Sequence, residues 1–442
     1  MPVFDTISEF GHFARRFAGR QVERVQDWHW FLRRRALPMV LLKDQLPLSA
    51  GQLERANEII DWIEEVVDAR PGYIERYGLN RAIHFPQAVW ALDDGQGLYD
   101  GFRAVASRDP RVLNHLRLWS QQFTGYRLLT MEPAECRPFP RVEEIGPAAD
   151  RRLSNLSSRP DRWVGRYLRI ASKLPTDFRI SPPPQLGEIG WNCAGRTVSF
   201  DTYTYLERLA ALHDCGMIER LRKIANSGRT PFIVEIGGGF GGLSYYLSQL
   251  IPQARIVIVD IPESLIFSSL YLSLLLPRSE HVYAKPDTDE PLVPATPGST
   301  FVPNYLFDKV IGTHVEFDLA INTLSMSEMD EAQVEYYCHG LNQLLAADGV
   351  FFEQNHDNKP VGRLNAKKII ARHFGRRQEI HSRAARAFTQ GRTHLWSHDP
   401  RITHAELTVS TSEISTAAHR IENTATSAVG NSRNAHALTG SQ

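Results

Sequence analysis

The second half of the chain alternates short β-branched runs with segments of helix length. The first five runs are FIVEI, RIVIVD, HVYAK, FDLAIN and GVFFEQ, at residues 232–236, 255–260, 281–285, 317–322 and 349–354. Helix-length segments lie between most of them, at 243–250, 264–275 and 329–346. Because strands that alternate with helices pair in parallel, this pattern predicts a doubly wound α/β sheet with helices on both faces.

Three further elements complete the predicted sheet. A helix is predicted at 362–374, and strands are predicted at 377–384 and 392–398, which brings the sheet to seven strands. The proline-rich segment Pro286–His314 is predicted to be an insertion between the third and fourth strands. It either shapes a substrate entrance or is a surface excursion.

The chain before the alternating part is predicted to be mainly helical. In the segment 51–70 the apolar residues recur at three- and four-residue steps, which is typical of an amphipathic helix. The segment 21–42 mixes aromatic residues with arginines, and it is expected either to pack a helix into the core or to lie on an anionic membrane surface. The predicted regions are therefore a helical part at 1–197, an α/β domain at 198–399 and a tail at 400–442, disordered from about residue 414.

Composition narrows the class of protein. A chain of 442 residues is longer than a domain with a single hydrophobic core usually is, so two domains are expected. Its 50 basic and 50 acidic side chains give a net charge of zero, so the overall charge does not favour nucleic acid as a partner. The four cysteines are far apart, which argues against a zinc cluster or a disulfide framework: Cys136, Cys193, Cys215 and Cys338. No signal peptide and no apolar run long enough to span a bilayer is visible, so a cytoplasmic location is expected.

A glycine-rich loop follows the first predicted strand, in the stretch PFIVEIGGGFGGLSYYL at 231–247. Gly237, Gly239 and Gly242 match GxGxxG, the dinucleotide pattern. Gly237, Gly239 and Gly241 equally match ExGxGxG, the first motif of class I methyltransferases that use S-adenosylmethionine (SAM). The Gly-Lys-Ser/Thr ending of a phosphate-binding Walker loop is absent.

Glu235 favours the methyl donor over the dinucleotide. Two residues before the first glycine, a dinucleotide fold has a buried strand position, where an unpaired carboxylate is costly. A carboxylate there is attracted by the sulfonium and ammonium of SAM, whereas it would repel a pyrophosphate. The alternative is that Glu235 is a solvent-paired residue at the strand end.

Asp260 ends the second predicted strand, in VIVDIPESL. Its carboxylate is predicted to accept hydrogen bonds from both ribose hydroxyls, and Ile261 is then placed to pack against the adenine. An alternative role for Asp260 is the N-cap of the helix that begins near Pro262. The two roles are compatible.

Taken together, the segments VEIGGGFGGLSYYL, VIVDIPESLIFSSLYLSLLLP and FDLAINTLSMSEM resemble the sugar O-methyltransferases of bacterial polysaccharide and glycoside pathways. The lead-in segment 187–221 is also similar to theirs, and the resemblance extends to about residue 399. It implies a class I methyltransferase fold, SAM as cofactor, methyl transfer to a sugar hydroxyl and a helical front half that covers the substrate. Asn322 in the third segment is expected at the cofactor.

The acceptor hydroxyl is a poor nucleophile, so a general base or a metal ion is expected. His356 is the predicted base, since an imidazole near its ordinary pKa suits proton abstraction at pH 7. Glu328 is either a second base or hydroxyl ligand, or an exposed acid at a helix start. Magnesium held by oxygens of Asn322, Asn355 and Asp357 is an alternative that the spacing does not favour.

Other interpretations stay open at this point. A basic segment at 363–377 either binds a sugar diphosphate or is the solvated face of a helix. The chain could instead be an NAD(P)-dependent oxidoreductase, or a non-catalytic protein that keeps the fold as a binding or scaffold module. A small sugar or glycoside is the expected partner, and a homo-oligomer is left open.

Overall fold

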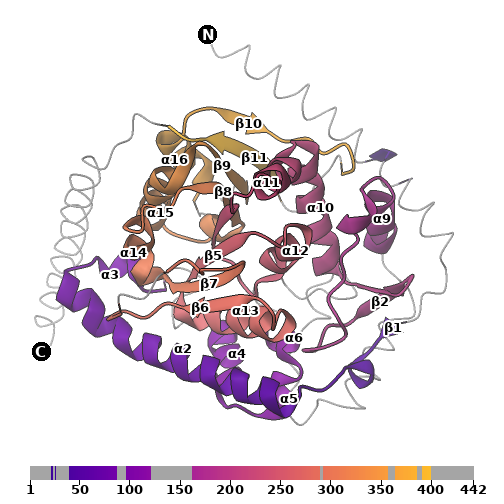
Figure 1. Cartoon of the computed structure of the whole chain (residues 1–442), viewed down its shortest axis with the longest axis horizontal. Helices are drawn as coiled ribbons and strands as arrows, with labels where there is room; N and C mark the ends of the chain where they lie inside the picture. Colours follow the sequence, from indigo (N-terminus) through magenta and orange to yellow (C-terminus); the bar gives the residue numbers. More distant parts are fainter. Residues whose placement is uncertain are drawn as a thin grey trace, which may run out of the picture.

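The computed structural model describes residues 21–22, 25, 39–86, 96–120, 162–288, 292–356, 364–385 and 391–399. Within them, one large sheet carries helices on both faces, and further helices from the N-terminal part of the chain pack at one end of it (Figure 1). The tail after residue 399 and most of the helix predicted at 21–42 lie outside the described residues. At the described end of that segment the prediction is wrong, because Met39–Val40 form a strand, β1.

Eight strands form the large sheet, in the order β10-β11-β9-β8-β4-β5-β7-β6. Their bounds are β4 Phe232–Ile236, β5 Arg255–Asp260, β6 Glu280–Tyr283, β7 Gly298–Pro303, β8 Phe317–Thr323, β9 Leu345–Asn355, β10 Arg377–Glu379 and β11 Arg392–Ser397. All neighbouring pairs from β9 to β6 are parallel, whereas β11 is antiparallel to both of its neighbours. The predicted doubly wound, Rossmann-like fold is confirmed.

The first strand of the large sheet in sequence, β4, lies between β5 on one side and β8 on the other. The chain therefore winds outward from β4 in both directions, and this is the topological switch point of the sheet. Ligands bind at such a point, beyond the carboxyl ends of the strands. The glycine-rich loop follows β4 directly and so lies at this edge.

The predicted count of seven strands is wrong by one, because β7 lies inside the segment taken for an insertion. All six residues of β7 are buried, and they pair with β5 and with β6. Gly298 allows the close approach of β6, since a Cβ on it would lie 1.8 Å from the carbonyl oxygen of Glu280. The third predicted run consequently forms the edge strand β6, and β7 takes the place beside β5.

The two faces of the sheet are covered by different helices. One face carries α10 Phe200–Asp214, α11 Met217–Asn226, α12 Gly242–Leu250 and α13 Pro262–Leu275. The other face carries α14 Phe307–Ile311, α15 Glu331–Leu344 and α16 Ala366–His373. Each face buries its own cluster of apolar side chains, because strand residues alternate between the faces: Ile233 faces one cluster and Val234 the other.

The N-terminal part is largely helical in its described residues. The predicted amphipathic helix is confirmed and is longer than expected: α2 runs from Ala50 to Tyr77, begins with a capping box at Ser49 and ends at Gly78 in the left-handed region. Shorter helices follow, at α3 Arg81–His84, α4 Gln96–Ala106, α5 Pro110–Leu113, α6 Leu116–Trp119 and α9 Arg162–Ala171. Among the described helices, none is long and apolar enough to cross a membrane.

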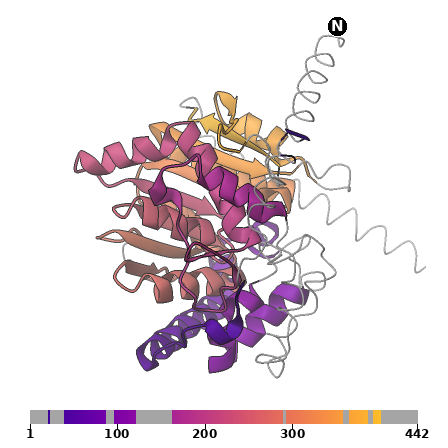
Figure 2. The same cartoon turned by 90° about the vertical axis from the view of Figure 1, so that its right-hand side faces the viewer.

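The N-terminal helices hold the sheet at its β6 edge. The indole N–H of Trp62 in α2 donates to the carbonyl oxygen of Ala284 (3.0 Å), and Arg70 forms a buried, two-pronged ion pair with Glu263 of α13 (2.6 and 3.1 Å). Figure 2 shows α2, coloured indigo, at the end of the molecule opposite to the hairpin of β10 and β11. The division into domains at residue 197 stays a prediction.

Smaller elements join the N-terminal part to the large sheet. A three-stranded antiparallel sheet consists of β1 Met39–Val40, β2 Gly190–Cys193 and β3 Arg196–Val198. Short 3₁₀ turns are η1 Leu42–Asp44, η5 Thr176–Phe178, η6 Asn304–Leu306 and η7 Ser325–Ser327. The segment at 187–199 thus contains two strands of the small sheet and is followed directly by α10.

Candidate functional site

The glycine-rich loop takes the backbone conformation of one of its two templates. Gly237, Gly239 and Gly241 have φ values of 72°, 56° and 83°, in the left-handed region that side chains disfavour. These are the three glycines of ExGxGxG. Gly242, the third glycine of GxGxxG, lies in the first turn of α12, where that pattern also places it, so this position does not separate the two templates.

Two of the glycines also allow close packing around the loop. A Cβ on Gly237 would lie 2.1 Å from the Ser325 hydroxyl oxygen, and one on Gly242 would lie 2.6 Å from the ring of Tyr205. The loop is therefore in contact with the end of β8 on one side and with α10 on the other. Larger residues at either position would push these elements away.

One pocket lies on the β5 side of the loop, and we name it the Asp260 pocket. It is open to solvent, and together with its mouth it spans about 840 Å³. Its lining is Pro86, Ile236, Gly237, Gly239, Val259, Asp260, Ile261, Ser264, Asn304, Thr323, Leu324, Ser325, Glu328, Met329, Gln333 and Tyr337. It is mainly apolar, with a few polar groups at defined places, as in most small-molecule sites.

The Asp260 carboxylate is held by three donors. It accepts from the backbone N–H groups of Gly239 (3.1 Å) and Ile261 (2.8 Å) and from the Ser264 hydroxyl (2.8 Å). A carboxylate has about four acceptor positions, so roughly one is left for a ligand and not the two that a whole ribose diol would need. Burial raises the pKa of Asp260 to about 6, against the effect of these hydrogen bonds.

Asp260 is not the N-cap of the helix that follows it. Ile261 occupies the N-cap position of α13, with Pro262 in the first turn, and no side chain caps the helix there. Asp260 instead joins the glycine loop to α13, because its carboxylate accepts from Gly239 and Ser264 together. Ile261 lines the Asp260 pocket, and its contact with an adenine ring stays a prediction.

A second pocket lies on the α10 side of the loop, and we name it the Arg208 pocket. Its lining is Asp201, Thr204, Tyr205, Arg208, Glu235, Gly237, Gly238, Gly239, Phe240, Leu243, Thr323 and Leu324. It shares Gly237, Gly239, Thr323 and Leu324 with the Asp260 pocket. One ligand that crosses the glycines can thus reach into both.

Glu235 lies in the Arg208 pocket and is 2% exposed. It accepts a hydrogen bond from the Ser244 hydroxyl (2.5 Å), so the interpretation of a solvent-paired strand end is wrong. Burial raises the pKa of this carboxyl to about 7, and the Ser244 hydrogen bond and the Arg208 charge oppose the rise. A cation bound nearby would favour the charged form.

Asn322 is buried beneath the loop and lines neither pocket. Its amide donates to the carbonyl oxygen of Ile236 (2.8 Å) and to the Ser325 hydroxyl (2.5 Å), and its oxygen accepts from the Asn355 amide (3.0 Å). These bonds join the ends of β4, β8 and β9. The structure therefore places Asn322 as a residue that positions the loop.

The two predicted catalytic residues differ in their surroundings. Glu328 is half-buried and lines the Asp260 pocket. His356 is exposed, directly after the end of β9, and lines neither pocket. Burial of part of the ring and the charge of Arg208 lower the pKa of His356, which keeps the imidazole neutral at pH 7.

The oxygens considered for magnesium are engaged in protein hydrogen bonds where the structure describes them. The amide oxygen of Asn355 accepts from the backbone N–H of Ser327 (3.1 Å), and that of Asn322 accepts from Asn355. Asp357 lies outside the described residues. In the described part of the chain, no group of three or more His, Cys, Asp or Glu side chains is arranged to hold a metal ion.

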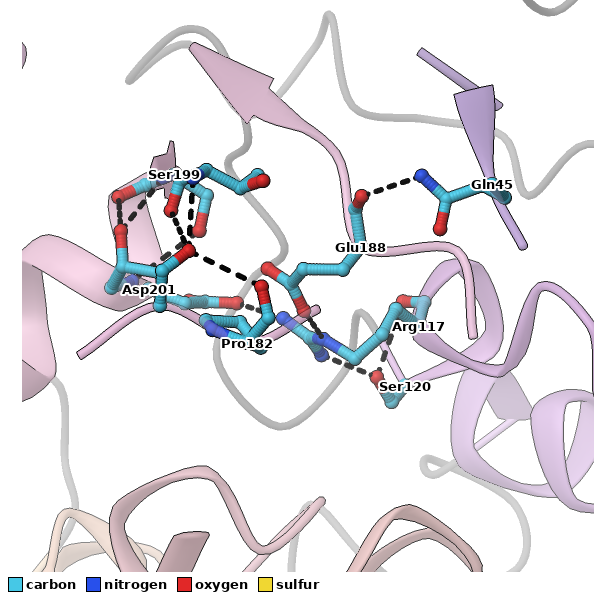
Figure 3. A network of polar contacts seen from close by, with 10 residues as sticks. Gln45, Arg117, Ser120, Pro182, Glu188, Ser199 and Asp201 are labelled. Atoms are coloured by element: carbon cyan, nitrogen blue, oxygen red, sulfur yellow. Dashed lines mark hydrogen bonds and ion pairs between the residues drawn. The ribbon is translucent and has the colours of Figure 1, made fainter. Parts of the chain in front are cut away.

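Sequence reasoning missed a buried charge cluster around Arg117 (Figure 3). The guanidinium of Arg117 is 0% exposed and donates to Glu188 (3.0 Å), Asp201 (2.5 Å) and Ser120 (2.6 Å). Burial raises the pKa of the Glu188 carboxyl, and the Arg117 charge opposes that rise. Asp201 also lines the Arg208 pocket, so the cluster joins the N-terminal helices to the wall of the site.

One feature of the sequence could have indicated these buried charged residues. Glu188, Asp201 and Arg208 all lie in the lead-in segment at 187–221, where several charges fall among aromatic and apolar residues. Charged residues are rarely fully buried unless they are paired, so a segment of this kind indicates either a solvated helix or a polar site. In the structure the segment contributes to a polar site, because Glu188, Asp201 and Arg208 are all less than 5% exposed.

No protein-family model matches the chain, and no curated protein matches it. Among the solved structures with some similarity, the three described next are methyltransferases at low identity, with TM-scores below 0.3. Human N-acetylserotonin methyltransferase in complex with SAM is 14% identical, with a TM-score of 0.26; the match covers 38% of this chain and only 47% of that one.

Two bacterial structures match a larger share of their own length. Magnesium protoporphyrin IX methyltransferase from Synechocystis PCC 6803, with bound SAH, is 13% identical, with a TM-score of 0.28; the match covers 46% of this chain and 88% of that one. The N-methyltransferase NodS from Bradyrhizobium japonicum WM9 is 12% identical, with a TM-score of 0.27. The match covers 42% of this chain and 95% of that one. The fold assignment rests on the strand order and the loop geometry described above.

Proposed function

We propose that this protein is a SAM-dependent O-methyltransferase that transfers a methyl group to a hydroxyl of a sugar or glycoside, in bacterial polysaccharide or glycoside biosynthesis. The methyl-donor part of the proposal is supported by the site geometry. The sugar acceptor is supported by the sequence resemblance of the segments around the glycine loop, Asp260 and Asn322.

The observation that carries the proposal is the pair of pockets joined across the glycines. On one side, Asp260 offers an acceptor for a ribose hydroxyl beside the apolar wall of Ile261. On the other side, Glu235 and Arg208 offer charges of both signs. A nucleoside linked to an amino acid has the matching chemistry at its two ends, and S-adenosylmethionine is such a molecule.

The same geometry disfavours a dinucleotide. A pyrophosphate over the glycines would lie beside Glu235, whose carboxylate repels it. Gly241, in the left-handed region, is a glycine of the methyl-donor template and an unrestricted position of the dinucleotide template. The NAD(P)-dependent alternative therefore has less support than the methyl donor.

The bound donor would supply a methyl group already activated by the sulfonium. The chain then has to orient the donor, exclude water and remove the proton of the acceptor hydroxyl. The glycine loop and Asp260 orient the nucleoside, and α10 closes the site on its other side. His356, neutral at pH 7, is the proposed proton acceptor, with Glu328 as a second candidate.

Calorimetric titration of the full chain with S-adenosylhomocysteine and with NAD tests the proposal. We expect the chain to bind S-adenosylhomocysteine and not NAD. Asp260→Asn is expected to weaken S-adenosylhomocysteine binding about tenfold, which is typical of one lost hydrogen bond to a charged group. Binding of NAD without binding of S-adenosylhomocysteine would overturn the proposal.

Turnover is tested separately, with labelled SAM and a panel of glycosides. Methyl transfer to at least one glycoside is expected. Donor binding with no transfer to any acceptor in the panel would favour the scaffold alternative, which keeps the cofactor site and lacks the reaction.

A further inference from the structure

We propose that Arg208 binds the carboxylate of the donor and that the Arg208 pocket receives the α-amino-acid end of SAM. This inference rests on the proposed function and assigns a specific partner within that site. Arg208 belongs to α10, which precedes the sheet in sequence, so the amino-acid end would be recognised by the lead-in segment and not by the sheet itself.

The side chains of α10 in this pocket occupy one face of the helix. Asp201, Thr204, Tyr205 and Arg208 are spaced by three, one and three residues, which brings them to the same side over two turns. That face is turned toward the glycine loop, because the Tyr205 ring contacts the Cα side of Gly242 and lies against the Phe240 ring, with centroids 6.0 Å apart. A ligand over the glycines therefore meets this face.

Arg208 is held in place before any ligand binds. It is 4% exposed, and its Nε donates to the side-chain oxygen of Gln354 at the end of β9 (2.9 Å). The guanidinium carbon lies 5.5 Å from the ring centroid of Tyr205. A planar guanidinium fixed in this way suits a carboxylate, because little side-chain entropy remains to be lost on binding.

The charges around Arg208 fit a zwitterion better than a simple anion. Asp201 is paired with Arg117 at 2.5 Å, and Glu235, which lines the same pocket, accepts a hydrogen bond from Ser244. A carboxylate beside Arg208 and an ammonium beside Glu235 would satisfy both signs at once. A phosphate would meet Glu235 with the wrong charge.

The test compares three ligands that share the thioadenosine and lose successive parts of the amino acid. They are S-adenosylhomocysteine, its decarboxylated analogue and 5′-methylthioadenosine, each titrated into the full-length wild type, Arg208→Gln and Arg208→Lys. In the wild type, we expect S-adenosylhomocysteine to bind about 10- to 100-fold more tightly than the decarboxylated analogue, the range for a hydrogen-bonded charge pair. In Arg208→Gln this preference should fall to within about threefold, and in Arg208→Lys part of it should return.

Binding of 5′-methylthioadenosine reports on folding and on the Asp260 pocket, and it should be unchanged in both variants. Arg220→Gln on α11, which removes a charge of the same kind outside both pockets, should keep the full preference. If Arg208→Gln keeps the wild-type preference while binding all three ligands, Arg208 has a structural role only and the inference is wrong. The inference also fails if Arg208→Gln does not fold and folded Arg208→Lys keeps the full preference.

If the proposed function is wrong, the titrations of the wild type give a different result from the one that overturns this inference alone. A wild type that binds none of the three ligands has no adenosyl site, and it overturns the proposed function together with this inference. A wild type that binds all three with equal affinity overturns this inference alone, because the nucleoside is then recognised without the amino acid.

Discussion

The guanidinium carbon of Arg117 lies 3.5 Å from the ring centroid of Phe240. Arg117 comes from the N-terminal helices and Phe240 from the glycine-rich loop, so a buried charge of one part is stacked on the loop of the other. The same guanidinium is paired with Glu188 and Asp201, both nearly inaccessible to solvent (Figure 3). This contact makes the order of the loop depend on residues far from it in sequence.

Arg117→Met should therefore be strongly destabilising. It leaves two buried carboxylates without their cation, and removal of one partner from a buried pair costs about 3–5 kcal/mol. We expect the free energy of unfolding in urea to fall by about that amount. The triple variant with Glu188→Gln and Asp201→Asn should recover part of the loss, since it removes the unpaired charges.

Arg111→Met is the matched control, because Arg111 pairs with Asp109 on the surface. An exposed pair of this kind contributes about 0–1 kcal/mol. If Arg117→Met costs no more than Arg111→Met, the cluster does not stabilise the fold in the way that its burial indicates.

Gly237→Ala should disrupt the site through two separate effects. The residue has φ of 72°, which costs an L side chain about 1–2 kcal/mol, and a Cβ there would lie 2.1 Å from the Ser325 hydroxyl oxygen. The loop must then move away from the end of β8. We expect loss of S-adenosylhomocysteine binding and a fall in the free energy of unfolding of more than about 2 kcal/mol.

Gly216→Ala separates the two effects. Gly216 has φ of 80° and nothing within 4 Å of its added Cβ, so that variant carries the backbone cost without the clash. It should leave ligand binding intact and cost about 1–2 kcal/mol. Equal losses in both variants would mean that Ser325 can move aside, and the close contact would then not explain the glycine.

Local patterns were sufficient to predict β4, β5 and the residues at their ends. Both strands have the predicted bounds, because their β-branched runs are bounded by turn-forming residues. Glu235, Asp260 and the glycines lie at one sheet edge for the same reason. In contrast, β7 was missed, since its sequence GSTFVP has glycine and proline at its ends and lies in a proline-rich segment.

The rest of the site could not be predicted because it depends on pairs that are distant in sequence. Arg117 meets Asp201 across 84 residues, and Arg208 meets Gln354 across 146. Nothing in the periodicity of either segment indicates which partner a buried charge will find. Asn322 was expected at the cofactor from the resemblance, whereas its amide is occupied by the ends of β4 and β9.

The stability of the ligand-free protein should fall as the pH rises toward 7, through Glu235. Burial raises the pKa of this carboxyl from 4.5 to about 7 in the folded state, so its contribution is fully present below about pH 4.5 and is lost as pH passes through 7. One pKa unit corresponds to about 1.4 kcal/mol, which makes the effect on the order of 3 kcal/mol.

Urea unfolding of wild type and Glu235→Gln from pH 5 to pH 8 measures this contribution. Gln keeps a hydrogen-bond acceptor for Ser244 and does not titrate, so the difference in free energy of unfolding between the two proteins should change by about that amount across the window. A difference that is constant with pH would show that the Glu235 pKa is not raised in the folded protein.

His356 should set the pH dependence of methyl transfer if it is the base. Its pKa is lowered from 6.5 by partial burial and by the charge of Arg208, so the rate should rise with pH below that value and be flat by pH 7. His356→Gln should lower kcat about 100- to 10,000-fold and abolish this rise, with unchanged affinity for S-adenosylhomocysteine. His381→Gln, at an exposed histidine after β10, should keep both the rate and the profile. Full turnover in His356→Gln, with the pH profile lost instead in Glu328→Gln, would move the role of base to the Asp260 pocket.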